Sequence, residues 1–142
     1  MILPKIISSG TPGAESAALD VAIQLEIPYG GFTMGNSMLD SYRATRRYKL
    51  WEKSFNNSRS KDEANLHIAD ATLIFTHGEL NRDLFFIDDY SVSHGRPSYH
   101  IDFNVTDPLQ AAFQISIWTD KHNPKSIFVA GSRERNDKHI YQ

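Results

Sequence analysis

The chain has 142 residues, enough for one domain with a continuous hydrophobic core, and its formal net charge is -2 at pH 7. This near balance argues against general attraction to nucleic acid or to an anionic membrane, so any anion binding must be local. The sequence has no cysteine, which excludes disulfides, thiolate metal sites and cysteine nucleophiles. No segment approaches the roughly 20 apolar residues of a membrane span, so we expect a soluble cytoplasmic protein.

The first structural signal is an apolar run that breaks into a turn of small residues. Residues 3–7 predict a strand and residues 14–25 predict a helix. Between them stand Ser8, Ser9, Gly10, Thr11, Pro12 and Gly13. This order places backbone N–H groups, hydroxyls and about half a positive charge around one point, which is typical of an anion site. Because the turn matches neither the dinucleotide fingerprint nor the Walker loop, an ordinary tight connection is an equal alternative.

The helix that follows carries one apolar stripe. The members of this stripe are Ala18, Leu19, Ala22, Ile23 and Leu25. We expect the polar residues, Glu15 among them, to face away from the core. Pro28 prevents the helix from continuing, and residues 27–32 predict a short strand. Within that strand, Gly30 and Gly31 allow a ligand or another strand to approach the backbone closely.

Residues 33–60 show no sustained pattern and predict a long loop. Inside it, residues 42–51 combine four arginine or lysine side chains with three aromatic rings. One interpretation is a lid over an anionic, planar ligand. The favoured interpretation is a solvated basic loop that is anchored by its aromatic side chains.

The second half of the chain alternates helices and strands. Residues 61–68 and 81–94 predict helices, and Gly95 is placed to end the second one in a left-handed conformation. Residues 71–76 and 98–102 predict strands, the first of them buried.

The last helix has a clear start. Asp107 predicts its N-cap and Pro108 its first helical position, with Gln110 as capping partner, and the helix runs to about residue 122. We expect its buried face to consist of Leu109, Ala112, Phe113, Ile117 and the neighbouring Trp118. Residues 126–130 predict the last strand, and residues 131–134 a sharp turn that repeats the small polar arrangement of the opening.

This order of elements predicts an α/β fold with an open, mostly parallel sheet of about five strands and helices on both faces. Ligands of such sheets lie outside the carboxyl ends of the strands. The turns at 9–13 and 131–133 fall at those ends. Whether the two turns are neighbours depends on strand order, which this pattern does not fix.

Two charged pairs are candidates for chemistry. They are Arg133 with Glu134, and Glu79 with Arg82, and structural ion pairing is the favoured interpretation of both. The six histidines include no pair at metal-ligand spacing. His77 is the one histidine at a predicted strand end, where a half-exposed loop residue is the ordinary interpretation. The sequence shows no serine nucleophile elbow.

Several motifs in one order resemble a known family. They are residues 7–13 with 17–20, residues 27–32, Arg47-Tyr48 with Leu50, Glu63 with Asn65, residues 70–74, 76–80, 95–97 and 129–134, and Ile140-Tyr141. The similarity runs nearly end to end. The chain resembles the putative molybdenum carrier family, a circularly permuted branch of the Rossmann-like superfamily that contains the lonely-guy nucleotide hydrolases.

The resemblance implies a Rossmann-like three-layer sandwich over residues 1–142 and a phosphorylated, nucleotide-like or pterin ligand. It implies a nucleotide or the molybdenum cofactor as the bound group and a homo-oligomer as the assembly. The balanced charge, independently, predicts no nucleic-acid or membrane partner. We expect the ligand to contact residues from four turns. These residues are Ser8, Ser9, Gly10, Thr11, Gly13, Gly30, Gly31, His77, Gly78, Glu79, Arg82, Gly131, Ser132, Arg133 and Glu134.

The sequence departs from the family pattern at both glycine-rich turns. The family usually carries Gly-Gly-Gln-Thr-Gly-Val-Asp-Arg where this chain has residues 9–16, and a Gly-Gly-Thr turn where it has Asn81-Arg82-Asp83. Pro12 removes a backbone donor, and Asp83 competes with an anion at a helix start. These losses favour a noncatalytic binding protein. A nucleoside-monophosphate glycosidic-bond hydrolase is the first alternative, and a degenerate member that acts through protein contacts is the second. The resemblance to the hydrolase branch implies that an Arg and a Glu assist cleavage of the glycosidic bond, and Arg133 with Glu134, or Glu79 with Arg82, could supply such a pair.

Overall fold

The structure is a computed structural model that describes residues 4–34, 48, 50–53, 57–133 and 137–141. In chain order its elements are β1 (Lys5–Ile7), α1 (Ala14–Gln24), β2 (Tyr29–Gly30), β3 (Phe32–Met34), β4 (Trp51–Lys53), α3 (Ser58–Ile68), β5 (Ala71–Thr76), α4 (Arg82–Ser93), β6 (Ser98–Asp102), α5 (Pro108–His122) and β7 (Ser126–Gly131). No helix in these residues is long and apolar enough to cross a bilayer.

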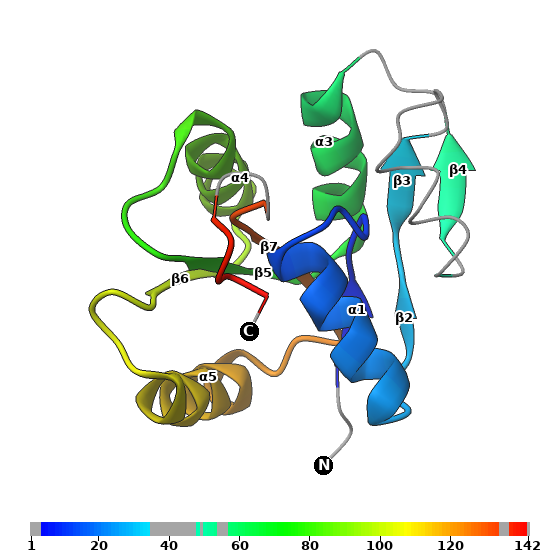
Figure 1. The fold of residues 1–142 in the computed structure, drawn as a ribbon. Helices are drawn as coiled ribbons and strands as arrows, with labels where there is room; N and C mark the ends of the chain where they lie inside the picture. The colour runs from blue at the N-terminus through cyan, green and yellow to red at the C-terminus, as the bar shows by residue number, and fades with distance from the viewer. Residues whose placement is uncertain (1–3, 35–47, 49, 54–56, 134–136, 142) are drawn as a thin grey trace.

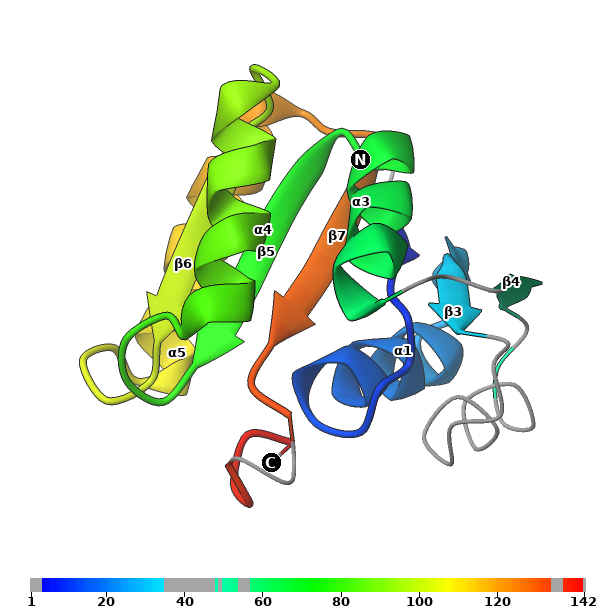
Figure 2. The same cartoon turned by 90° about the horizontal axis from the view of Figure 1, so that it is seen from above.

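The main sheet has five strands in the order β2-β1-β7-β5-β6, and every neighbouring pair is parallel. β1 and β7, the first and last strands of the described chain, are therefore neighbours inside the sheet. Figure 2 shows β5, β6 and β7 running in the same direction, with α3 and α4 in front of them. The predicted α/β fold with a parallel sheet of about five strands is confirmed, and it is a Rossmann-like arrangement.

Alternating side chains give the sheet two apolar faces, each covered by a pair of helices. On one face, Ile74 and Phe128 pack with residues of α3 and α4. On the other face, Leu73 and Val129 pack with Ala111 of α5 and with Ala18 of α1. Figure 1 shows α3 and α4 on one side of the sheet and α5 on the other. The fold therefore has three layers, as expected.

The strand predicted at 27–32 is divided in two at Gly31, which has a φ of 135°. β2 pairs with β1, whereas β3 leaves the main sheet and pairs with β4. The side chain of Asn65 on α3 holds β3 in place, because it accepts from the Phe32 N–H at 2.7 Å and donates to the Phe32 carbonyl at 3.0 Å. A strand of three residues that depends on one side chain and on a strand of equal length is too short to produce an alternating pattern in the sequence.

The long loop predicted at 33–60 is therefore wrong in part. It contains β4, most of β3 and the first turn of α3, which begins at Ser58 rather than at residue 61. Asn57 caps α3 by accepting from the Ser60 N–H at 2.8 Å. Much of the proposed lid, residues 42–47 and 49, lies outside the described residues. Tyr48 is buried beside Leu19, so its ring belongs to the core and is not a stacking platform for a ligand.

Two predictions of helix orientation are also wrong in part. On α1, Leu19 and Ala22 are buried as expected, but Glu15 is buried too, while Ile23 and Leu25 are exposed. On α5, Leu109, Ala112, Phe113 and Ile117 face solvent, whereas Trp118 packs against the core as expected, and Ala111 is the buried residue of the described helix. The start of α5 is as expected, since Asp107 accepts from the Gln110 N–H at 2.9 Å.

Gly31 allows a backbone contact that no side chain permits. A Cβ atom there would lie 2.2 Å from the carbonyl oxygen of Ser8, while a Cβ at Gly95, which has a φ of 72°, would meet nothing within 4 Å. We expect Gly31→Ala to lower the free energy of unfolding by more than about 3 kcal/mol, because a steric collision adds to backbone strain. Gly95→Ala, the control, should cost only about 1 kcal/mol. Urea unfolding measures the free energy of unfolding of the two variants. Equal losses of stability would contradict the steric collision at Gly31.

Candidate functional site

The turns after β1 and β7 meet at the carboxyl edge of the sheet. β1 pairs with β7 in a register that sets Ile7 opposite Phe128. Beyond the strands, the Ala14 N–H donates to the Ser132 carbonyl at 3.1 Å, and Gly13 forms an isolated bridge with Arg133. The two turns that the sequence analysis could not place relative to each other are therefore in contact.

Gly131 makes this junction tight. A Cβ atom there would lie 2.3 Å from the carbonyl oxygen of Phe75 and 2.6 Å from the Cβ of Ala14. Glycine at the end of β7 thus lets the start of α1 and the end of β5 approach together. The junction places the N-terminus of α1 beside the strand ends where Rossmann-like proteins bind ligands.

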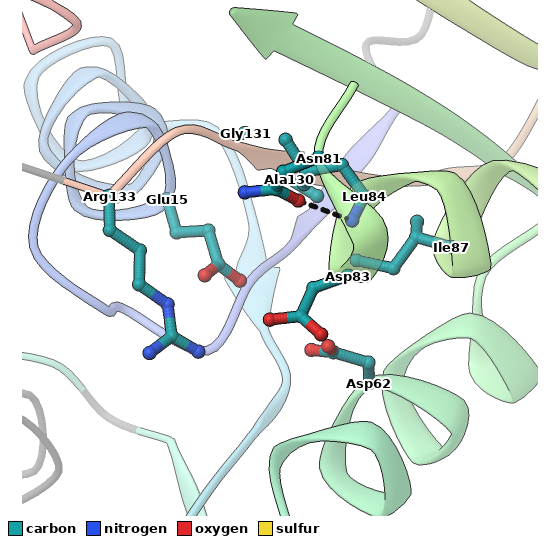
Figure 3. Close-up of a pocket in the computed structure, with 9 residues that line it drawn as sticks. All are labelled: Glu15, Asp62, Asn81, Asp83, Leu84, Ile87, Ala130, Gly131 and Arg133. Atoms are coloured by element: carbon teal, nitrogen blue, oxygen red, sulfur yellow. Dashed lines mark hydrogen bonds between the residues drawn. The ribbon is translucent and has the colours of Figure 1, made fainter. Parts of the chain in front are cut away.

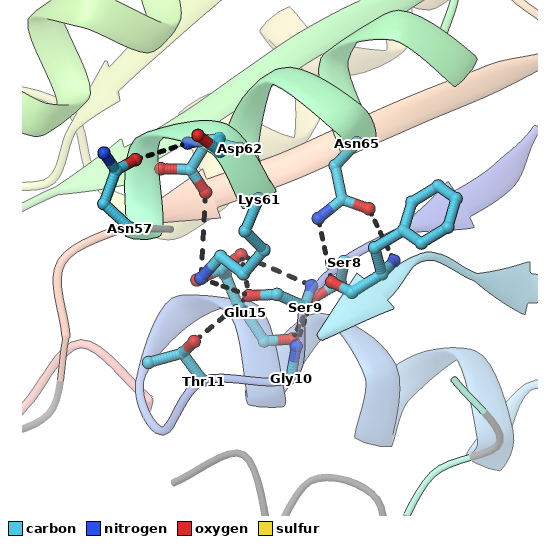
Figure 4. Close-up of polar contacts among 11 residues, drawn as sticks. Ser8, Ser9, Gly10, Thr11, Glu15, Asn57, Lys61, Asp62 and Asn65 are labelled. Carbon is cyan, nitrogen blue, oxygen red and sulfur yellow. Dashed lines mark hydrogen bonds and ion pairs between the residues drawn. The ribbon is translucent and has the colours of Figure 1, made fainter. Parts of the chain in front are cut away.

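The turn after β1 is occupied by a carboxylate of the protein itself (Figure 4). The Glu15 Oε1 accepts from the Ser9 hydroxyl at 2.7 Å and from the Ser9 N–H at 3.4 Å. Two other amides of the turn are also bonded internally, because Gly10 donates to the Ser8 hydroxyl at 3.1 Å and Gly13 donates to the Ser16 hydroxyl at 3.0 Å. The Glu15 carboxylate takes the place that an external anion was expected to fill.

A buried lysine connects this turn to α3. The Lys61 ammonium donates to the Ser9 hydroxyl at 3.3 Å and lies 3.8 Å from Oδ1 of Asp62. Its positive charge partly compensates the buried carboxylates, which would otherwise be costly to remove from water. Sequence reasoning missed Lys61 and Asp62, because nothing in the pattern of α3 indicates which residues face β1.

A small pocket opens next to this cluster, at the N-terminus of α4 (Figure 3). It has a volume of about 60 Å³ and is lined by Glu15, Asp62, Asn81, Asp83, Leu84, Ile87, Ala130, Gly131 and Arg133. Figure 3 shows the carboxylates of Asp62 and Asp83 directed toward each other, with Glu15 and Arg133 on the other side. The volume accommodates a few atoms of a ligand, and the lining offers acceptors together with one cation.

Asp62 is the most perturbed acid in this pocket. Its pKa is raised from 3.8 to about 7, chiefly because burial penalises the carboxylate, and the negative charges of Glu15 and Asp83 add to the rise. The positive charges of Lys61 and Arg133 act in the opposite direction. Asp62 accepts no hydrogen bond from any described residue and has Lys61 as its ion-pair partner. Near neutral pH it can therefore donate or accept a proton in the pocket.

Arg133 provides the uncommitted cation. Among the described residues, its guanidinium forms no hydrogen bond and no ion pair within 4.0 Å, although Glu15 lines the same pocket. A half-buried guanidinium with free donors can bind a phosphate or a carboxylate in a bidentate way. Its predicted partner, Glu134, lies outside the described residues.

The predicted residues after β5 lie at the same edge of the sheet but bond elsewhere. The His77 Nδ1 lies 2.7 Å from Oδ2 of Asp137, which ties the C-terminal turn to β5. The Gly78 N–H donates to Asp102 at 2.7 Å, and this bond is the chief reason why the pKa of Asp102 is lowered. Glu79 and Arg82 are exposed and do not line the pocket.

Of the predicted ligand residues, Gly131 and Arg133 line the pocket. Ser8, Ser9, Gly10, Thr11 and Gly13 form the adjoining turn, Ser132 connects β5 and α1, and Gly30 and Gly31 lie beside β1. Glu15, Asp62 and Asn81 are pocket residues that the sequence analysis did not propose, while Asp83 was considered only as a competitor of an anion. No three His, Asp or Glu side chains in the described part of the chain are arranged to hold a metal ion.

A second cavity, of about 350 Å³, lies on the opposite face of the sheet between α1 and α5. Its lining is apolar and includes Val21, Phe75, Phe103 and Ile115. It offers no charged group to a phosphorylated ligand. The acidic pocket at α4 contains Arg133 and lies at the carboxyl edge of the sheet, which makes it the candidate site for such a ligand.

A family model for circularly permutated YpsA SLOG proteins matches residues 6–142. The chain belongs to this family. It is also similar to the crystal structure of a putative molybdenum carrier protein from Syntrophus aciditrophicus SB, with 34% sequence identity and a TM-score of 0.92 over 99% of this chain and 89% of that one. No curated protein matches. The resemblance found in the sequence is thus confirmed, and this chain shares the fold of that crystal structure.

The buried acid makes stability depend on pH. The pKa of Asp62 is higher in the folded protein than the ordinary 3.8, so the folded state binds this proton more tightly than the unfolded state does. This tighter binding stabilises the fold fully below about pH 4, and the stabilisation is lost as the pH rises to about 7. Asparagine does not ionise, so Asp62→Asn abolishes this pH-dependent loss of stability. We expect the stability of the variant relative to wild type to grow by roughly 2–3 kcal/mol between pH 5 and pH 8, at about 1.4 kcal/mol per pKa unit.

Urea unfolding at the two pH values tests this. Glu63→Gln is the matched control, since Glu63 is the next residue on α3 and is exposed. A pH-independent difference between Asp62→Asn and wild type would show that Asp62 ionises normally.

Proposed function

We propose that this protein binds a phosphorylated, nucleotide-like or pterin ligand at the pocket between the β1 and β7 turns, and that it does so without catalysis. The observation that carries the proposal is the guanidinium of Arg133, which pairs with no described residue and lines an acidic pocket at the carboxyl edge of a Rossmann-like sheet. A cation beside acceptors matches a ligand that has an anionic group and hydrogen-bond donors close together.

The charges of the pocket indicate how such a ligand lies. Glu15 already fills the β1 turn, and Asp62 and Asp83 repel an anion from the interior of the pocket. We therefore expect the phosphate of the ligand to lie at Arg133. The acids accept from the donor-bearing part of the ligand, either ribose hydroxyls or the adjacent N–H and NH₂ groups of a guanine or pterin ring.

The residues present do not fit a molybdenum ion held directly by protein ligands. The chain has no cysteine, and the described residues include no cluster of three metal-ligating side chains. Carboxylates in the pocket also oppose the oxyanion molybdate. A relation to molybdenum, as in the name of the similar crystal structure, would have to come through a pterin that carries the metal.

Substitution of Arg133 tests the proposed phosphate contact. We expect Arg133→Ala to weaken GMP binding roughly 10- to 100-fold, because charge-assisted hydrogen bonds contribute about 1.5–3 kcal/mol. Binding of guanosine, which lacks the phosphate, should change little. Isothermal titration calorimetry with GMP, AMP and a pterin phosphate measures this.

Arg59→Ala serves as the control, because Arg59 lies over the Phe86 ring and outside the pocket lining. Equal weakening of GMP and guanosine would contradict a phosphate contact at Arg133. If no phosphorylated ligand binds to wild type, the proposal is wrong, and the role through protein contacts becomes the better account.

A second function, hydrolysis of the glycosidic bond of a nucleoside monophosphate, is favoured by one observation. Asp62 has a pKa of about 7 and shares the pocket with Glu15 and Arg133. A protonated Asp62 can give its proton to the leaving base, while a carboxylate stabilises the oxocarbenium ion and water adds to the sugar carbon. The products are the free base and ribose 5-phosphate, and the proton released by water restores the acid.

Release of free base from AMP or GMP tests this second function by chromatography. We expect an active wild type to lose at least about 100-fold in rate on Asp62→Asn, the range typical of a general acid, while Glu63→Gln stays active. Binding of GMP without base release between pH 6 and pH 8 would exclude hydrolysis of these substrates and leave the binding function intact.

A further inference from the structure

The outer face of α5 is apolar and has no cover within the described part of the chain. Leu109, Phe113 and Ile117 are exposed to 82%, 68% and 54%. With the exposed Ala112 and Ser116, they follow the i, i+3, i+4, i+7, i+8 spacing of a helix face that is buried against a partner. Three large apolar side chains in one row on a helix are more than the isolated exposed residues of an ordinary surface.

The domain itself uses the other side of this helix. Ala111 is buried against the sheet, with Ile115 and Trp118 packed around the same cluster. α5 is thus apolar on two sides, and the sheet covers one of them. None of the described residues covers the outer side.

We propose that α5 pairs in an antiparallel way with α5 of a second copy of this chain, across a two-fold axis at Phe113. The outer row is symmetric about that residue, because Leu109 stands four positions before Phe113 and Ile117 four positions after it. An antiparallel pair therefore sets Leu109 of one copy against Ile117 of the other and Phe113 against itself. This is the self-complementarity that an isologous interface requires.

The charges of the helix support a second copy as the occupant. No charged residue occurs between Pro108 and Thr119, so two identical faces approach without repulsion. Opposed helix dipoles add a small attraction to an antiparallel pair. The charged residues Asp107, Asp120 and Lys121 stand at the ends of the helix, outside the apolar row.

The size of the row sets the strength of the dimer. The step from Leu109 to Ile117 spans about 12 Å at roughly 1.5 Å per residue, so the contact is smaller than the ~800 Å² per partner of a standard interface. Exposed Val105, just before the helix, extends the row at one end. We therefore expect a reversible dimer that dissociates in the micromolar range.

Sedimentation velocity of the full chain from about 2 to 200 µM tests this association. Wild type should shift from monomer to dimer over the series, and Phe113→Glu should stay monomeric. Phe85→Glu is the matched control, because Phe85 is 61% exposed on α4, on the other face of the sheet, and that variant should still dimerise. A monomeric wild type at every concentration, or dimers of both variants, would overturn the proposal.

Cysteine cross-linking tests the antiparallel arrangement and does not rely on a charged substitution. The natural chain has no cysteine, so each introduced thiol is the only one present. Under mild oxidation, Phe113→Cys should form a covalent dimer with itself. Leu109→Cys should not do so alone, but should cross-link to Ile117→Cys in a mixture. Self-cross-linking of Leu109→Cys, or none at Phe113→Cys, would overturn the two-fold axis proposed here.

Discussion

The parallel pairing of β1 with β7 is the contact on which the other features of this molecule depend. It joins a strand near one end of the sequence to a strand near the other end, and it brings the turns that follow them together. Gly131 makes the junction compact, because a side chain there would overlap the carbonyl of Phe75 and the Cβ of Ala14. The N-termini of α1 and α4 and the side chain of Arg133 then surround one small pocket.

Charge, more than shape, determines what this pocket can hold. Glu15 binds the amide and hydroxyl of Ser9, so the protein supplies its own anion to the β1 turn. Lys61 and Arg133 balance part of the acidic charge, but burial still keeps Asp62 close to half-protonated at neutral pH. A suitable ligand therefore has hydrogen-bond donors that face the carboxylates and an anionic group that pairs with Arg133. A bare oxyanion can pair with Arg133 but offers no hydrogen-bond donors to the carboxylates.

The sequence predicted what local chemistry determines. The Asp107 cap, the left-handed Gly95 and the buried strand β5 each depend on residues within one element, and all were found. Strand order depends on contacts between distant segments, so the meeting of the two turns was not predictable. The burial of Glu15 and Asp62 depends on the same contacts.

The errors in α5 and in residues 33–60 have different physical origins. On α5 the period of the apolar residues was correct, but the row of Leu109 and Phe113 faces outward, since periodicity does not tell which molecule covers a face. In residues 33–60, the short strands β3 and β4 depend on each other and on Asn65, and such pairings leave no pattern in the chain.

The central claim, that the ligand site lies where the β1 and β7 turns meet, is tested most directly by mapping GMP binding through amide chemical shifts in ¹H–¹⁵N NMR spectra. We predict that the largest changes cluster at Gly131, Ser132 and the first turn of α4, with smaller ones at Ser9 and Gly10. Changes confined to the apolar cavity between α1 and α5, or spread evenly over the chain, would contradict the claim.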